Sequence, residues 1–304
     1  MQISASGSRA KARAGGVRNS SWSYAITSWL GLVPFLLFCL LFELLPAVVI
    51  LQGSFLDQNG AFTLNNYQRV FSQVSNLHAF QTSIMLSLVT ALLGVLFGFL
   101  AAYGVYNLRP HWLRNFLISF SSIAANFAGV PLAFAFVATL GATGFITVLF
   151  HSWFHVNLYD LGFNLYTFWG LVLVYLYFQF PLMILITVPA LAALRPEWRE
   201  AATNLGASNF TYWRRVALPI LLPSIVAALM LLFANSFGAF ATAFALAQGN
   251  INLVPILISF VVNGNVSIDY GLGNALAVGM IVVLFVAVLL YTAMLRRVST
   301  WQGR

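Results

Sequence analysis

A series of long apolar runs constrains the fold of this chain more than any other feature. Several of them reach the ~20 residues that an α-helix needs to cross the hydrocarbon core of a bilayer. We predict six spans, at about 29–51, 80–105, 116–140, 166–191, 222–247 and 272–295. Because unpaired backbone polar groups are costly in hydrocarbon, each span should be a helix. The sequence therefore predicts an all-α, multi-pass membrane protein.

Composition favours one membrane domain, at 29–298, over a soluble domain with an anchor. Hydrophobic residues make up 61% of the chain and charged residues 7%, whereas soluble domains hold about a quarter charged residues. Residues 1–28 lack apolar periodicity, and we expect a disordered basic cytoplasmic tail there. The apolar stretch at 141–150 is too short to span and is expected to be an interfacial or re-entrant helix. The single cysteine, Cys39, excludes an intramolecular disulfide.

The distribution of positive charge predicts the orientation of the spans, because short cytoplasmic loops retain Lys and Arg. Every Lys and Arg except Arg69 precedes span one, lies between spans two and three or four and five, or follows span six. Both ends of the chain and the loop at 195–221 are therefore expected in the cytoplasm. This topology explains the net charge of +8, with some contact to anionic membrane lipid, so nucleic-acid binding is not expected.

The loop at 195–221 is the long polar interruption between predicted spans. Pro196 suits the first turn of a helix, and Gly206 suits its end, because a left-handed residue costs glycine little. Ser208 is a suitable N-cap for a second helix. The sequence therefore predicts two short helices joined by a glycine turn.

The second helix of this loop should carry an apolar ridge, formed by Phe210, Trp213 and Val216 at a spacing of three. Pro219 and Pro223 are expected to end that helix before span five. No other part of the chain is predicted to cover the ridge. An exposed apolar ridge flanked by charges indicates a docking element for a partner.

These residues resemble the EAA motif of the permeases of binding-protein-dependent ABC transporters. Val216 replaces the usual isoleucine, and the identities at the motif's spacing are Glu200, Ala201, Ala202, Gly206, Leu218 and Pro219. Phe180–Pro181 and the FGAF sequence at 237–240 are similar to the permeases for polyamines, ferric iron, 2-aminoethylphosphonate, thiamine and sulfate. The resemblance covers most of the chain from span one onward.

The resemblance implies the fold of a type I importer permease, whose EAA loop forms a coupling helix in a groove of a cytoplasmic ATPase. Glu200 would pair with a basic residue of the ATPase, Gly206 would form the turn, and Ala207 with the Trp213 ridge would fill the groove. It also implies an ATPase dimer, a second permease that is identical or paralogous, and an extracytoplasmic solute-binding protein. The assembly would lie in a bacterial inner membrane.

The chain itself is not expected to be an enzyme or to hold a cofactor. Its only lysine, Lys11, lies in the predicted tail, so the sequence contains no GxxxxGK[ST] phosphate-binding loop. ATP and Mg²⁺ would be bound by the ATPase subunit. The energy for transport would therefore come from a partner.

Polar residues within the spans are candidates for lining a solute path. A charge at the bilayer centre costs about 2.5–3.5 kcal/mol on insertion scales, so Glu43 in span one should face the bundle, a cavity or a partner. In a path it would favour a cationic solute, and otherwise it would be a protonated or hydrogen-bonded carboxyl beside Pro46. The other candidates are Asn126, Gln179, Asn235 and Ser236. For each of these, an interhelical hydrogen bond is the alternative.

Other functions have weaker support in the sequence. His151 and His155 lie one helical turn apart with Asp160 nearby, a weak zinc signal, so no metal site is expected. An ion-gradient-driven secondary transporter would need paired ionisable residues or inverted repeats. An intramembrane enzyme would need a nucleophile and a base at one depth, but every histidine lies outside the spans. A polyamine-like solute is the first candidate, ahead of iron, phosphonate and thiamine.

Overall fold

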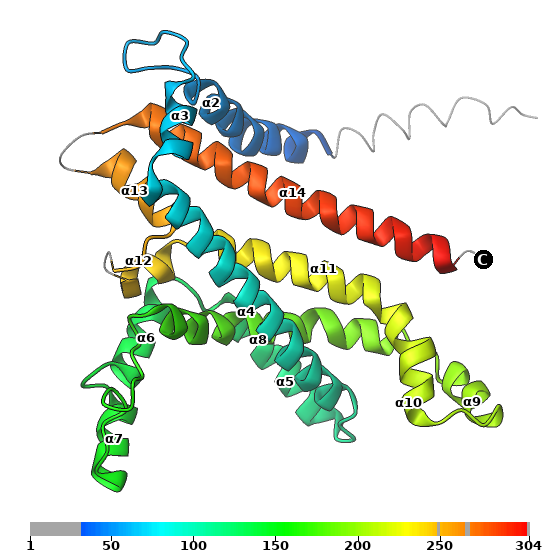
Figure 1. The fold of residues 1–304 in the computed structure, drawn as a ribbon. Coiled ribbons are helices and arrows are strands. Elements are labelled where there is room, and N and C mark those ends of the chain that lie inside the picture. Colours follow the sequence, from blue (N-terminus) through cyan, green and yellow to red (C-terminus); the bar gives the residue numbers. More distant parts are fainter. Residues whose placement is uncertain (1–31, 248–249, 265–267, 303–304) are drawn as a thin grey trace, which may run out of the picture. The chain divides into compact units, whose positions relative to one another are not determined.

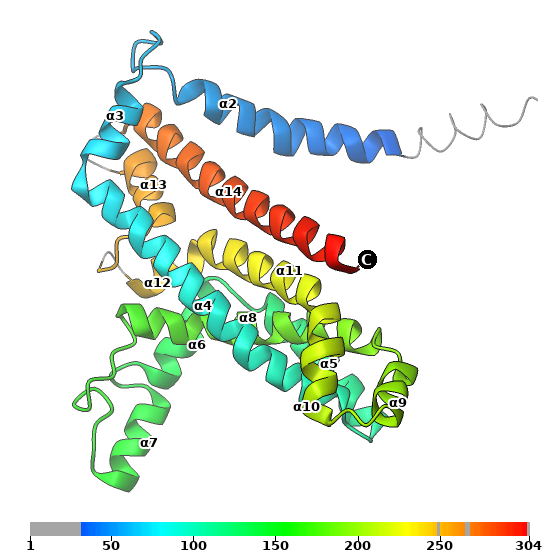
Figure 2. The same ribbon diagram turned by 45° about the vertical axis from the view of Figure 1, so that its right-hand side comes forward.

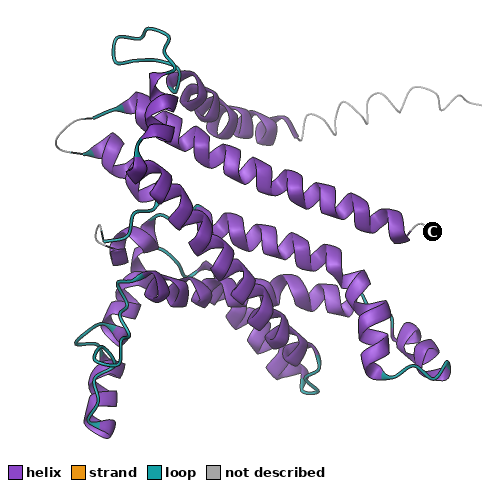
Figure 3. Ribbon diagram, viewed as in Figure 1, coloured by secondary structure: helices purple, strands orange, loops and turns teal. Residues whose placement is uncertain are grey.

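The computed structural model describes residues 32–247, 250–264 and 268–302, which contain helices and no β-strand (Figure 3). The chain divides into two compact units, residues 1–52 and 53–304. The predicted tail at 1–28 and residues 29–31 of the first predicted span lie outside the described residues. Six helical segments are long and apolar enough to cross a membrane: Leu32–Gly53, Val74–Tyr106, Val130–Phe154, Phe168–Ala192, Asn209–Phe237 and Tyr270–Ala293.

The first unit contains the helix that begins at Leu32 and includes a π-helical turn, η1 (Leu40–Leu44), followed by α2 (Leu45–Gly53). The Leu45 N–H donates to the Leu40 carbonyl, five residues earlier. The next residue, Pro46, has no N–H, and its ring would clash with the carbonyl four residues before it in an ordinary α-helix. The wider turn therefore lets the helix continue through the proline.

The second unit contains the remaining helices (Figure 1). They are α3 (Asn65–Ser72), α4 (Val74–Tyr106), α5 (His111–Asn126), α6 (Val130–Leu140), α7 (Phe145–Phe154), α8 (Phe168–Ala192), α9 (Pro196–Asn204), α10 (Asn209–Tyr212), η2 (Trp213–Ala217), α11 (Leu218–Phe237), α12 (Ala241–Ala247), α13 (Val254–Asn263) and α14 (Tyr270–Gln302). At 1.5 Å per residue, α4 is about 50 Å long. The packing of α4 on α8 and α11 forms the centre of this unit.

Small residues explain why these three helices pack closely. One face of α4 is buried along its length and repeats small side chains every three or four residues: Ala79, Ser83, Ser87, Thr90, Ala91, Gly94, Gly98 and Ala102. A Cβ on Gly98 would lie 2.5 Å from the Met183 Cβ, so only glycine fits there. Small residues in such a stripe let helix backbones approach closely inside a membrane.

Two of the predicted spans are broken in the structure. The predicted span at 116–140 is interrupted at residues 127–129, between α5 and α6, and the predicted span at 222–247 is interrupted at 238–240, between α11 and α12. The stretch expected to be re-entrant belongs largely to α7, which with α6 makes the third candidate span. The Thr242 hydroxyl holds one break, since it accepts from the Gly129 N–H at 2.8 Å.

Candidate functional site

Two short helices, α9 and α10, form the elbow predicted at 195–221, and Figures 1 and 2 show them beyond the ends of α8 and α11. At the end of α9, the Gly206 N–H donates to the Thr203 carbonyl and the Ala207 N–H donates to the Ala202 carbonyl, both at 2.9 Å. This pair of bonds is a Schellman motif. Gly206 has a φ of 75°, so the predicted glycine turn is confirmed.

The second helix begins as predicted but does not end where expected. The Ser208 hydroxyl accepts from the Thr211 N–H at 3.2 Å, which confirms the N-cap. The helix then continues from α10 through η2 into α11, so the expectation that Pro219 ends it was wrong. The Leu218 N–H donates to the Trp213 carbonyl, five residues earlier. As at Pro46, a π-helical turn directly before the proline accommodates its ring.

The elbow carries two strongly exposed apolar side chains and an exposed carboxylate. The motif residues on α9 and its turn are exposed or half-buried: Glu200, Ala201, Ala202 and Ala207. Leu205 is 88% exposed and Phe210 is 73% exposed. Leu205 lies directly before the glycine turn and outside the helical ridge, so helical periodicity did not indicate it. Hydrophobic side chains this exposed on a rigid turn indicate a surface that a partner covers.

Trp213 does not belong to that surface. Its ring is half-buried and lies edge-on against the Tyr103 ring of α4, with 5.3 Å between the ring centroids. The buried residues nearby are Tyr212 and Ala217, spaced by five rather than three or four. The π-helical turn holds one extra residue and so shifts the buried face. Of the predicted ridge, Phe210 is exposed, whereas Trp213 packs against α4 in this structure.

Two of the predicted path residues form a buried hydrogen-bonded network at the centre of the bundle. The Gln179 amide of α8 donates to the Thr90 hydroxyl of α4 at 2.9 Å, and the Ser236 hydroxyl of α11 lies 2.9 Å from the same oxygen. Gln179 is fully buried, and its Oε1 has no hydrogen-bond partner among the described residues. Gln179 and Ser236 thus join three helices instead of lining an open path in this conformation.

Asn235 has a different environment from its neighbour Ser236. It is exposed and lines a cavity of about 380 Å³ between the two helix breaks, together with Phe178, Gly129 and Thr242. No charged side chain lines this cavity. Irregular backbone at membrane depth is tolerated where it is buried in protein or lines a cavity. This cavity is therefore the best candidate for part of a solute path in the described residues.

Asn126 does not line that cavity, and Glu43 belongs to the other unit. The Asn126 amide, at the end of α5, donates to the Ser122 carbonyl at 2.8 Å. Glu43 lies in the π-helical turn η1 of the first unit, where its side chain is exposed. Thr90, Gly129 and Thr242 were missed because a hydroxyl or a glycine in an apolar run gives no local signal of a partner far along the chain.

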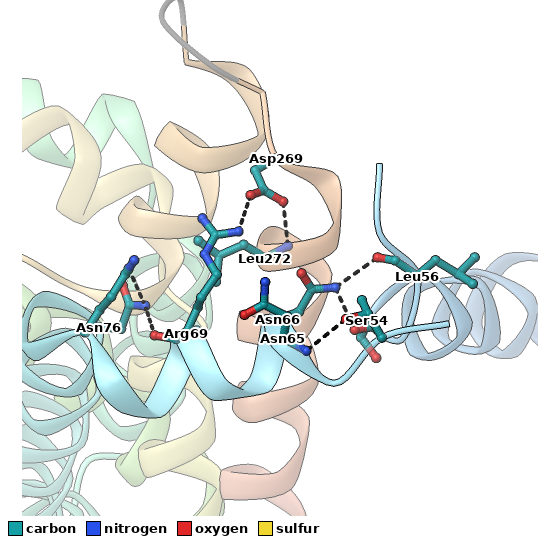
Figure 4. A network of polar contacts seen from close by, with 10 residues as sticks. Ser54, Leu56, Asn65, Asn66, Arg69, Asn76, Asp269 and Leu272 are labelled. Atoms are coloured by element: carbon teal, nitrogen blue, oxygen red, sulfur yellow. Dashed lines mark hydrogen bonds and ion pairs between the residues drawn. The ribbon is translucent and has the colours of Figure 1, made fainter. Parts of the chain in front are cut away.

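The other end of the second unit holds a polar network (Figure 4). The Arg69 guanidinium on α3 contacts the Asp269 carboxylate at 2.6 Å, just before α14. The Asn66 amide donates to the carbonyls of Ser54 and Leu56. Burial alone raises the pKa of Asp269, but bonds from the Leu272 N–H and from Arg69 outweigh it and hold that pKa below its ordinary value.

The histidine pair does not extend into a metal site. His151 lies on α7, and His155 follows it with a left-handed backbone at a φ of 56°. Within the described residues, no group of three or more His, Cys, Asp or Glu side chains is placed to hold a metal ion.

Residues 94–300 match the family described as the binding-protein-dependent transport system inner membrane component. A probable sulfate transport system permease protein of Nephroselmis olivacea is 24% identical, over 89% of this chain and 87% of that protein. A spermidine/putrescine transport system permease protein of Haemophilus influenzae is 24% identical, over 82% of this chain and 87% of that protein.

A chain of known structure has a similar fold. It belongs to a bacterial ABC transporter involved in the import of the acidic polysaccharide alginate. It is 18% identical, with a TM-score of 0.71, over 91% of this chain and 98% of that chain. At this level of identity the likeness concerns the fold alone.

Proposed function

The chain belongs to the family of binding-protein-dependent transport system inner membrane components, and from this premise we propose that its elbow receives the motion of a cytoplasmic ATPase dimer. The observation that carries the proposal is the surface formed by Glu200, Leu205 and Phe210. Leu205 and Phe210 are strongly exposed on either side of a turn that two backbone hydrogen bonds fix. Such a surface suits a groove with an apolar floor and a basic residue at its edge.

The elbow is joined to the bundle in a way that suits the transmission of force. α10, η2 and α11 form one uninterrupted helix from Asn209 to Phe237. A displacement of the elbow would therefore move α11, which carries both Ser236 and Asn235. The hydrogen bond between Ser236 and Thr90 is then a contact that alternating access would strain. ATP and Mg²⁺ would be bound by the ATPase and not by this chain.

We further propose that the solute is delivered by an extracytoplasmic binding protein and passes between this chain and a second permease, a copy or a paralogue. The cavity beside Asn235 has no charged lining, so it would offer hydrogen bonds to a solute without trapping an ion. Selection would then rest mainly with the binding protein. A polyamine-like solute remains our first candidate, in keeping with the relative named for spermidine and putrescine. The relative named for sulfate makes sulfate the competing candidate.

Substitution of an exposed elbow residue tests the docking role. Leu205→Asp should abolish co-purification of the ATPase while the protein remains folded in the membrane, because an unpaired charge would be buried in the interface. The matched control is Leu161→Asp, since Leu161 is also strongly exposed, at 67%, but lies between α7 and α8. Normal ATPase binding by the Leu205 variant would contradict the proposal.

Reconstitution distinguishes this function from an ion-gradient-driven transporter. Proteoliposomes that contain the permeases, the ATPase and the binding protein should transport solute only when ATP is present on the side of the membrane that the ATPase faces. Uptake by this chain alone under an ion gradient would overturn the proposal. Parallel assays with labelled spermidine and sulfate would separate the two candidate solutes.

A further inference from the structure

A second cavity, of about 220 Å³, lies between the elbow and the ends of α4 and α8. It is smaller than the ~300–1,000 Å³ typical of sites for drug-sized ligands. Aromatic side chains from two helices line it: Tyr103, Tyr106, Tyr212 and Trp213. Tyr and Trp collect where a membrane protein meets the headgroup region. The cavity therefore has the size and the composition of a site for one small polar group.

The charge in this cavity is mainly positive. Two guanidinium groups, of Arg195 and Arg199, lie in the lining with one carboxylate, that of Glu200. Among the described residues, neither arginine has a carboxylate within ion-pair distance. Arg195 lies over the Trp198 ring, 5.9 Å from its centroid, and this stacking orients its guanidinium.

Two other groups point to an anionic ligand. Arg114 lies over the Tyr106 ring, 5.7 Å from its centroid, and adds a third guanidinium beside the lining. Tyr212 also lines the cavity. Its hydroxyl can donate a hydrogen bond to a ligand oxygen there.

We propose that this cavity binds the phosphate group of an anionic phospholipid. Guanidinium groups bind phosphate through paired hydrogen bonds, and basic pockets between membrane helices bind acidic headgroups on the cytoplasmic side. A phosphate bound here would contact α9 through Arg199 and α10 through Tyr212, on the inner side of the elbow. Lipid composition would then tune the position of the elbow. Lipid binding requires neither the ATPase nor the solute, so it can fail or succeed independently of the proposed transport function.

Binding of lipid to the full-length chain tests the proposal. Purified protein would be titrated with phosphatidylglycerol or cardiolipin, and with phosphatidylcholine for comparison, and retained lipid would be measured by native mass spectrometry. The double variant Arg195→Gln/Arg199→Gln should weaken retention of the anionic lipids by about tenfold or more. The matched control is Arg214→Gln/Arg215→Gln, which removes the same charge from exposed residues of the same loop outside the cavity lining.

The test compares the loss of anionic-lipid retention in the cavity variant with the loss in the control. A small loss, under about threefold, in the control and a large loss in the cavity variant would support the site. Equal losses in both variants, or none, would overturn it. Tyr212→Phe removes only the hydroxyl and should also weaken retention, by about fivefold, without affecting phosphatidylcholine.

A competition arm separates lipid from soluble phosphate. Inorganic phosphate and ATP would be added to protein loaded with anionic lipid. If millimolar inorganic phosphate leaves the lipid bound, the acyl chains contribute and the lipid is the ligand. If it displaces the lipid in the wild type, a soluble phosphate is the ligand and the lipid assignment is overturned.

Discussion

At the scale of single residues, Gly206 shows how a backbone requirement can be separated from a steric one. Its φ of 75° favours glycine, yet a Cβ added there would meet no atom within 4 Å. A β-branched residue would therefore be strained by its backbone alone. Gly60, on the loop before α3, has a φ of 78° and equally open surroundings, so it is a matched position outside the elbow.

We predict that Gly206→Val strains the elbow by about 1–2 kcal/mol and weakens ATPase association at least about tenfold. Gly60→Val carries the same strain and should leave ATPase association unchanged. Gly206→Asn should retain most of the ATPase association, because asparagine tolerates the left-handed region. Pull-down with a tagged ATPase measures all three. A Gly206→Val protein that binds the ATPase normally would remove the turn from the docking surface.

The Arg69–Asp269 pair predicts a pH dependence of stability. The pKa of Asp269 in the folded protein lies below its ordinary value of 3.8, so its stabilisation is present above that value and is lost as the pH falls through the lower, folded pKa. Because Arg69 is 36% exposed, we expect about 1 kcal/mol at most.

Thermal unfolding of wild type and Asp269→Asn checks this expectation. The difference in Tm should be full at pH 6 and should shrink as the pH falls toward about 3. Asp160→Asn removes an exposed carboxylate elsewhere and should leave Tm unchanged at either pH. A difference for Asp269→Asn that grows on acidification would contradict the sign of the pKa shift.

At the scale of elements, the sequence predicted what local chemistry determines. The turn at Gly206 and the N-cap at Ser208 depend on neighbouring residues only, and both are present. The helix breaks at 127–129 and 238–240 were not predicted, because the apolar composition runs through them. A hydrogen bond between Gly129 and Thr242, 113 residues apart, holds the first break, and one from the Tyr175 hydroxyl to the Ala239 carbonyl holds the second. Such a contact has no signature in a single sequence.

Trp213 was expected on the exposed face of the second elbow helix, but it faces α4. Periodicity arguments assume 3.6 residues per turn, and the π-helical turn η2 violates that assumption just before Pro219. The turn η1 before Pro46 follows the same pattern. Pro181, Pro189 and Pro223, however, lie inside α-helices without a π-helical turn before them, so proline alone does not signal one.

Replacing Pro219 tests whether this shift matters. Pro219→Ala restores an N–H that can donate to the Arg215 carbonyl, so η2 should become α-helical and rotate the elbow by about 100° relative to α11. We expect stability to rise, because alanine is favoured over proline inside a helix by about 3 kcal/mol, and coupled uptake to fall. Pro223→Ala, one turn further along α11, should raise stability without loss of uptake. Unchanged uptake in Pro219→Ala would show that the angle of the elbow is not critical.

At the scale of the whole molecule, transport requires that α4, α8 and α11 pack closely and yet rearrange. The small-residue stripe of α4 provides the close packing, as at Gly98 against Met183. The network of Gln179, Thr90 and Ser236 adds few bonds, and one buried oxygen of Gln179 lacks a partner among the described residues. An unsatisfied buried acceptor costs about 1–3 kcal/mol. The conformation described here is therefore held less tightly at its polar centre than a fully bonded network would hold it.

The buried Gln179 and the cavity-lining Asn235 should respond differently to substitution. Gln179→Met removes one hydrogen bond but also the unsatisfied oxygen, so the free energy of unfolding should change by less than about 1 kcal/mol, and uptake should continue. Asn235→Leu leaves the packing intact because the side chain is exposed to the cavity, but it removes the amide from the proposed path, so uptake should fall at unchanged Tm. Measuring Tm and uptake on both variants separates packing from path. Blocked uptake in Gln179→Met with normal uptake in Asn235→Leu would reverse the two assignments and place the path through the buried network.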